Sequence, residues 1–187
     1  MKRISLIAIV FSAVLLLQNC KKDTYTATAS TTSTLYAVIN DTTWTPDTLS
    51  ASITYNSVAK TKVFSFSGQI LGKQINAAVT KSSGSNTPGF PLATYNVNNT
   101  SNVVLTYFNK QKNSSGNYVF VQQGTVAPGS GTLTVTAVDS VKKVITGTFS
   151  FTAKQNNYDS NGNITSVFVA NVFFGSFNKM PYSFVSN

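Results

Sequence analysis

From about Leu35 to the end of the chain, apolar and polar residues alternate with a period of two. The clearest case is Ile145–Ala153, where apolar residues or glycine occupy every second position and Thr or Ser fills the positions between them. A β-strand with one face in a core and the other in water has this alternation, because successive side chains point to opposite faces. The pattern therefore predicts half-buried strands rather than helices.

The same alternation predicts about ten strands, at residues 36–40, 49–55, 64–70, 75–80, 93–97, 103–108, 118–121, 133–137, 145–153 and 165–174. The short polar link Val138–Lys143 is typical of a hairpin turn. Thr, Val and Phe are plentiful, and no segment has a helical apolar stripe. We expect an all-β fold, an antiparallel β-sandwich of about ten strands, with a lipocalin-like up-and-down β-barrel as the alternative.

One strand departs from the one-sided pattern. Between Val167 and Phe174 both faces are apolar, with Phe173 on one face and Phe174 on the other if the alternation is strict. Such a strand is either covered on both sides or exposes an apolar stripe to a ligand. We favour the covered arrangement.

The N-terminal segment has the pattern of an export signal. Lys2 and Arg3 precede an apolar run, residues 4–17, that at 1.5 Å per residue reaches about 21 Å, short of a bilayer core of about 30 Å. The following Leu17-Gln18-Asn19-Cys20 resembles the lipobox of bacterial lipoproteins. That resemblance implies cleavage before Cys20 and a lipid on its thiol. We therefore expect a signal peptide at 1–19, lipidated Cys20 with a Thr/Ser-rich tether at 20–33, and a single all-β domain at 34–187.

The charge of the predicted mature chain is positive. Residues 20–187 hold twelve Lys, five Asp and no Arg, Glu or His, a formal charge of +7. Nucleic-acid recognition favours Arg, so this composition argues against a nucleic-acid partner. The close pairs Lys60/Lys62, Lys110/Lys112 and Lys142/Lys143 are expected near hairpin ends, where charge discourages edge-to-edge pairing.

Three segments together resemble a family of Bacteroidota lipoproteins with an all-β domain of unknown function. They are the strand, turn and tryptophan of 37–44, the two strands 131–139 and 145–153, and the ending Gly175-Ser176-Phe177 with Met180-Pro181-Tyr182. The resemblance implies a membrane-anchored, non-catalytic β-domain in the cell envelope, at the outer membrane, with no active-site residues to transfer.

The composition limits the possible chemistry. Without His or Glu, and with Cys20 as the only thiol, neither a His-based nucleophile nor a Cys/His zinc site can be built. Ser57-Val-Ala-Lys60 matches a serine–lysine motif, and Asp159-Ser-Asn161-Gly-Asn163 resembles the start of a calcium loop. Both lie between strand patterns and are expected to be turns. We expect no catalytic residue, no metal and no cofactor.

Two aromatic residues are candidate ligand contacts. Trp44 follows the first predicted turn, where it is either a core residue or a sugar platform, and Tyr158 precedes the Asn161-Gly162 turn. Asp41 and Asp47 flank Trp44 as a carboxylate pair, although Asp is common in turns for backbone reasons. Two hypotheses stay open. The first is a membrane-anchored envelope lipoprotein with a structural or interaction role, and the second is a glycan- or small-ligand-binding module.

Overall fold

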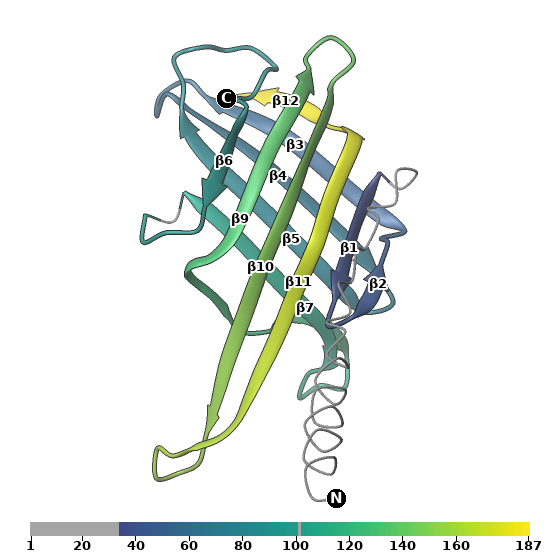
Figure 1. Cartoon of the computed structure of the whole chain (residues 1–187), viewed down its shortest axis with the longest axis vertical. Helices are drawn as coiled ribbons and strands as arrows, with labels where there is room; N and C mark the ends of the chain where they lie inside the picture. Colours follow the sequence, from purple (N-terminus) through teal and green to yellow (C-terminus); the bar gives the residue numbers. More distant parts are fainter. Residues whose placement is uncertain (1–33, 101) are drawn as a thin grey trace, which may run out of the picture.

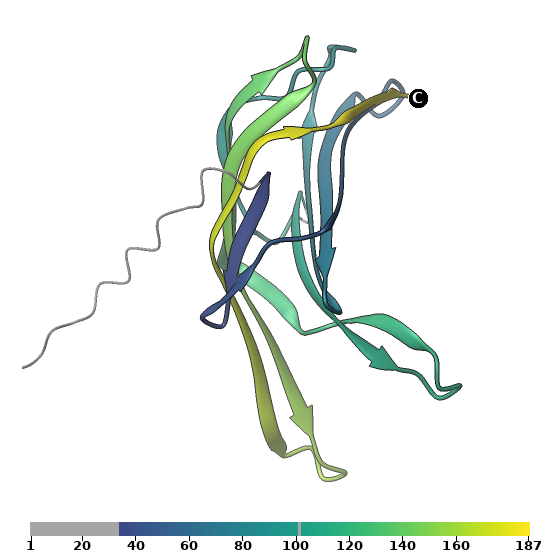
Figure 2. The ribbon, with the colours of Figure 1, turned by 90° about the vertical axis from the view of Figure 1, so that its right-hand side faces the viewer.

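The computed structural model describes residues 34–100 and 102–187, and these residues form two six-stranded sheets packed face to face. Figure 1 looks through both layers, and Figure 2 shows them from the side. The predicted all-β sandwich is confirmed. The strands remain in two separate sheets and do not close into one up-and-down barrel.

Sheet A contains the N-terminal strand and the longest hairpin, and all of its neighbouring strands are antiparallel. Its order is β2 (Thr42–Trp44), β1 (Leu35–Ile39), β11 (Ile164–Pro181), β10 (Val144–Tyr158), β9 (Thr125–Asp139) and β6 (Ala93–Asn96).

Sheet B is an antiparallel meander with one added strand. Its order is β12 (Ser183–Ser186), β3 (Thr48–Asn56), β4 (Thr61–Ile70), β5 (Lys73–Ser82), β7 (Val103–Lys112) and β8 (Tyr118–Gln122). β12 pairs with β3 in parallel, so the end of the chain crosses from sheet A to the edge of sheet B.

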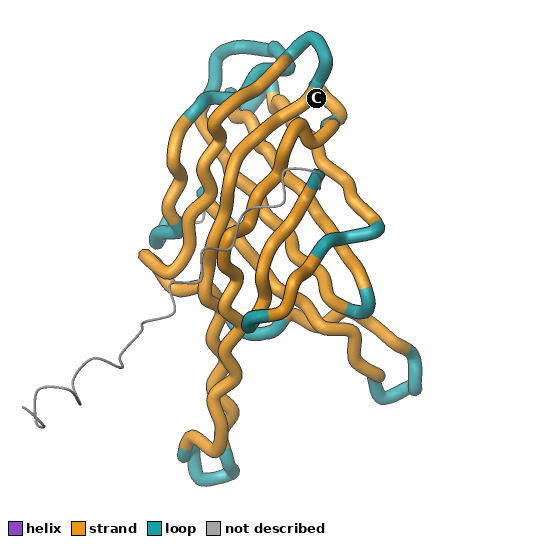
Figure 3. Tube along the Cα trace, turned by 45° about the vertical axis from the view of Figure 1, so that its right-hand side comes forward, coloured by secondary structure: helices purple, strands orange, loops and turns teal. Residues whose placement is uncertain are grey.

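Each of the ten predicted strands is present, and several are longer than predicted (Figure 3). The sequence pattern missed two short strands, β2 and β12. Three or four residues are too few for period-two alternation to be recognised.

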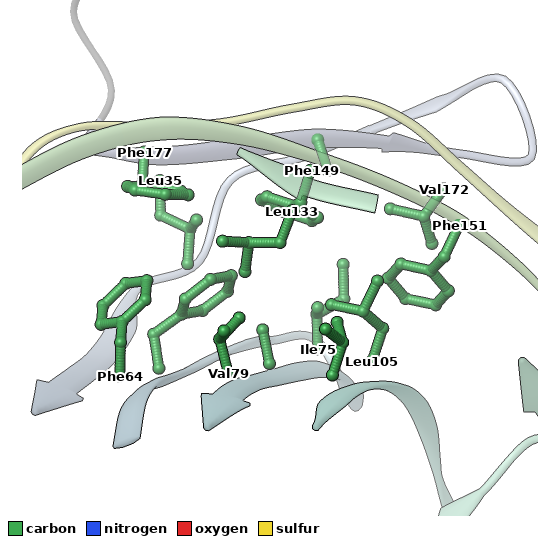
Figure 4. Close-up of a cluster of buried hydrophobic side chains, with 14 of the residues drawn as sticks. Leu35, Phe64, Ile75, Val79, Leu105, Leu133, Phe149, Phe151, Val172 and Phe177 are labelled. Atoms are coloured by element: carbon green, nitrogen blue, oxygen red, sulfur yellow. The ribbon is translucent and has the colours of Figure 1, made fainter. Parts of the chain in front are cut away.

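The core lies between the sheets and is rich in phenylalanine. Figure 4 shows Phe177 and Phe149 of sheet A facing Phe64 of sheet B across the interior. The ring centroids of Phe64 and Phe177 lie 5.6 Å apart, and those of Phe66 and Phe149 lie 5.3 Å apart, both in tilted geometry. Tilted aromatic pairs add to the free energy gained from burial alone.

Two hairpins continue past the packed layers at the same end of the molecule. In Figure 2 the β10–β11 and β7–β8 hairpins both extend downward and diverge from one another. The far part of β10, from Lys154 to Tyr158, is exposed on every residue, as is β11 from Ile164 to Val167. This end of the sandwich therefore presents two projecting ribbons.

Candidate functional site

A β-bulge in β11 turns two consecutive phenylalanines toward solvent. Phe151 pairs with Val172 and Phe149 pairs with Gly175, so β11 carries one more residue than β10 between these positions. Val172 and Gly175 both remain on the inner face. The two residues between them, Phe173 and Phe174, are 41% and 46% exposed. We call these two residues the phenylalanine pair.

The structure corrects the expectation that this strand is covered on both faces. Phe173 and Phe174 share the outer face of sheet A, because the bulge shifts the alternation by one residue. Their ring centroids are 6.5 Å apart. The outward residues beside the pair on β9 and β10 are Thr and Ser, whereas on β1 they are Tyr36, opposite Ser176, and Val38, opposite Phe173. The pair therefore stands between a hydroxyl-rich surface and two large side chains of β1.

The backbone at the phenylalanine pair is in a costly conformation. Phe174 has φ of +50°, a left-handed conformation that is rare for bulky residues. The next residue must be glycine, because a Cβ at Gly175 would contact the carbonyl oxygen of Phe149 and lie 2.7 Å from its ring. Strained backbone persists where the surrounding structure enforces it, and such sites are often functional.

Two hollows flank the phenylalanine pair on this face. One, of about 320 Å³, is lined by Phe174, Thr148 and Ser176, and the other, of about 270 Å³, by Phe173 and Thr152. Thr132 and Ser150 line both hollows, and their hydroxyl oxygens lie 3.3 Å apart. The side chains that line the hollows are apolar or carry hydroxyls, and none of them is charged.

Such a surface can bind but has no group suited to proton transfer. Aromatic rings stack on apolar C–H faces of a ligand, and Thr and Ser hydroxyls both donate and accept hydrogen bonds. Among residues 34–100 and 102–187, no group of three or more His, Cys, Asp or Glu is placed to hold a metal ion. The same residues include no helix long and apolar enough to cross a membrane.

Trp44 is a core residue and does not form a surface platform. It is 2% exposed, and its indole lies against the inner face of β4, where a Cβ at Gly68 would come within 2.9 Å of the ring. Its Nε1 is buried without a hydrogen-bond partner. Of the two interpretations of Trp44, the core residue therefore agrees with the structure, and the ring has no face available to a sugar.

Tyr158 is 59% exposed on the projecting part of the β10–β11 hairpin. Its hydroxyl accepts a hydrogen bond of 3.3 Å from the Asn156 side-chain amide. The structure does not bring Trp44 and Tyr158 together, since one is buried on β2 and the other lies near the hairpin tip. Cys20 lies outside the described residues.

The Asp159 segment forms the predicted hairpin turn. The Asp159 carboxylate accepts hydrogen bonds from the backbone N–H groups of Asn161 and Asn163, at 2.9 and 2.8 Å. These bonds, with one from the Asn163 side chain, hold the pKa of Asp159 below its usual value. The carboxylate is therefore used by the turn itself.

The Ser57–Lys60 segment is also a turn, between β3 and β4. The Asn56 side-chain oxygen accepts hydrogen bonds from the N–H groups of Val58 and Ala59. Serine–lysine chemistry needs a helical turn, so this segment does not provide it.

The structure also corrects the expectation for Lys62, which is buried rather than an exposed edge residue. It is 3% exposed, and its ammonium donates to Thr87 Oγ1 at 3.0 Å and to the Gly89 carbonyl at 2.8 Å. Burial lowers the pKa of this ammonium. The Tyr182 hydroxyl donates to the Pro88 carbonyl at 2.8 Å. Lys62 and Tyr182 together hold the loop at 83–92 against the core through these hydrogen bonds. The sequence does carry a sign of this burial, because the alternation that places Phe64 on the inner face of β4 also places Lys62 there.

Comparisons with protein-family models, with curated proteins and with solved structures found no match. The site is therefore interpreted from its own geometry and chemistry.

Proposed function

We propose that this protein is an envelope lipoprotein, anchored through Cys20, whose β-sandwich is a non-catalytic binding domain. The observation that carries the proposal is the phenylalanine pair. Two exposed aromatic rings stand beside a surface of Thr and Ser residues on β9 and β10, and one ring is held in strained backbone. A purely structural domain gains nothing from exposing both rings, since apolar surface in water is unfavourable.

The ligand class that this surface fits best is an uncharged glycan. Sugars combine apolar C–H faces, which stack on aromatic rings, with hydroxyls that bond to Thr and Ser side chains. The two hollows on either side of the shared Thr132 and Ser150 suit neighbouring units of one chain. The lack of charged lining residues favours a neutral ligand over a uronic acid or a phosphate.

A glycan screen with the full-length lipidated chain in detergent tests the binding function. We expect a neutral oligosaccharide to bind, and we expect Phe173→Ser with Phe174→Asn to weaken binding by about 30-fold. That estimate takes about 1 kcal/mol of stacking for each ring. Val104→Ser, which removes a 45% exposed side chain from the outer face of sheet B, is the matched control. Equal binding by the double variant and the wild type would refute the site.

The anchor is tested separately. Labelled palmitate should be incorporated into the wild-type chain, and Cys20→Ala should release the protein into the soluble fraction. Unchanged fractionation of Cys20→Ala after a high-salt wash, which removes electrostatic contacts, would contradict the anchor without affecting the glycan site.

A further inference from the structure

The turn between β4 and β5 carries an apolar residue where the backbone disfavours one. Leu71 and Gly72 form a two-residue hairpin turn, with φ of +47° and +75°, between paired residues Ile70 and Lys73. Two-residue turns with both φ positive favour Asn, Asp or Gly. Leu71 is nevertheless 93% exposed, so no packing contact compensates for its conformation.

A second hairpin turn in the same protein follows the usual preference. Asn40 and Asp41, between β1 and β2, also have positive φ, at 45° and 62°. The chain therefore uses polar turn residues at one such site and an exposed leucine at the other. Exposure alone is not unusual, but exposure combined with strain suggests that the Leu71 side chain has a partner outside the chain.

The β7–β8 hairpin lies against this turn and adds further exposed apolar groups. The N–H of Lys110 donates to the Gly72 carbonyl at 2.7 Å, which fixes the turn to the hairpin. Tyr118 is 62% exposed and Val119 is 40% exposed on the projecting ribbon. A hollow of about 650 Å³ lies between the turn and the hairpin, with Leu71 and Tyr118 among its lining residues.

Three lysines surround these apolar groups. Lys73 and Lys110 line the hollow, and Lys112 lies near the end of β7. The ammonium of Lys112 is 5.4 Å from the centroid of the Tyr118 ring, within cation–π range. We call Leu71, Lys73, Lys110, Lys112 and Tyr118 the basic hairpin patch.

The charge near the patch is mainly positive, with an exception at Asp47, whose N–H donates to the Gln69 carbonyl at 3.2 Å beside the β4–β5 turn. The sequence contains no Asp or Glu between residues 48 and 138, a range that includes every strand of sheet B except β12, and Ser183–Ser186 has no charged residue. The strands of this sheet therefore contain lysines and no acidic residue. A surface of this kind attracts anionic partners, most strongly at low ionic strength.

We propose that the basic hairpin patch docks on a bilayer surface that contains anionic phospholipids. Lysines contact the phosphate groups, while Leu71 and Tyr118 enter the headgroup layer, the arrangement typical of interfacial membrane binding. An anionic polysaccharide accounts for the lysines alone, and gives no reason for a strained, exposed leucine. The patch lies on sheet B, so docking leaves the phenylalanine pair of sheet A accessible.

Docking of the patch on a membrane does not depend on glycan binding by sheet A. If Cys20 is acylated, the chain between Cys20 and Thr34 spans at most about 45 Å, so the patch can reach the membrane that holds the anchor.

The test uses a fluorescent probe on the full-length lipidated protein in vesicles. With Cys20 acylated, a cysteine introduced by Gln111→Cys, at an exposed residue that lines the hollow, is the single free thiol and is labelled with a polarity-sensitive dye. We expect a blue shift in vesicles of phosphatidylcholine and phosphatidylglycerol, and none in phosphatidylcholine alone. Val58→Cys, in the β3–β4 turn at the far end of sheet B and 91% exposed there, is the control and should not shift.

Charge variants give the second arm. Neutralising the three patch lysines should lower the ratio of docked to free domain by about 150-fold, at about 1 kcal/mol for each lysine. The control neutralises three lysines outside the patch, so the net charge changes equally in both variants. Because these lysines do not contact the bilayer, docking of the control should stay within about threefold. The two variants are Lys73→Gln/Lys110→Gln/Lys112→Gln and Lys60→Gln/Lys81→Gln/Lys142→Gln.

Three results would overturn the proposal. The first is a shift that does not depend on phosphatidylglycerol, and the second is an equal loss in both triple variants. The third is a shift produced by a soluble polyuronate and not by vesicles, which would assign the patch to an anionic glycan instead.

Discussion

Replacing Leu71 by asparagine should stabilise the protein. In the turn between β4 and β5, Leu71 has φ of +47°. A left-handed conformation costs an ordinary residue about 1–2 kcal/mol, and Asn tolerates it much better. Because Leu71 is 93% exposed, its removal forfeits no more than about 0.2 kcal/mol of burial. Leu71→Asn should therefore raise the free energy of unfolding by about 1 kcal/mol.

Unfolding by heat or urea, followed by the fluorescence of the single, buried Trp44, measures this change. A gain of about 1 kcal/mol corresponds to a rise in Tm of roughly 2–4 °C in a chain of this size. Leu71→Ala is the matched control, since it removes the side chain but keeps a Cβ in the same conformation. If Leu71→Asn is no more stable than Leu71→Ala, the strain argument is wrong. If docking on anionic vesicles also survives Leu71→Asn undiminished, the leucine has no role in membrane contact.

Three further changes follow from local geometry. Gly147→Ala should lower the free energy of unfolding in urea by about 3 kcal/mol or more, because its Cβ would overlap the backbone of β9. Gly84→Ala is the control: its Cβ meets no atom within 4 Å, so stability should change by less than about 0.5 kcal/mol. Asp159 has a lowered pKa, so its carboxylate stays ionised at every pH above the usual carboxyl pKa. Its hydrogen bonds to the turn are lost only as the pH falls through the lowered pKa. The Asn163 amide shift in NMR should titrate accordingly, and should lose this titration in Asp159→Asn. Lys62→Met removes both hydrogen bonds from the ammonium to the loop at 83–92, and should speed amide exchange there by about tenfold; unchanged exchange would show that the loop is held by other contacts.

The sequence pattern predicted most of the fold because one face of nearly every strand is buried. Alternation of apolar and Thr or Ser residues marks such strands directly, as at Ile145–Ala153, where the buried positions are those predicted. β2 and β12 were not predicted, because such short strands contain too few residues to show an alternation of apolar and polar positions. The parallel pairing of β12 with β3 depends on tertiary packing and has no local signal.

The candidate site could not be found from the sequence pattern alone. Strict alternation places Phe173 and Phe174 on opposite faces, and only the extra residue in β11 puts both outside. A bulge depends on the register between two strands, which neither strand encodes by itself. Lys62 was misjudged for a related reason, since charge suggested the surface whereas its phase with Phe64 and Phe66 indicated the interior.

The pairing of β1 with β11 affects when the protein can fold. Leu35, at the start of the first strand, pairs with Phe177, close to the end of the chain, and β11 also joins β1 to the rest of sheet A. β1 therefore has no partner in β11 until residues 172–177 have been synthesised. Closing so long a loop is slow, and contacts between distant parts of a chain delay folding. With this order of strands, sheet A cannot be completed during synthesis until β11, the last of its strands along the chain, is available.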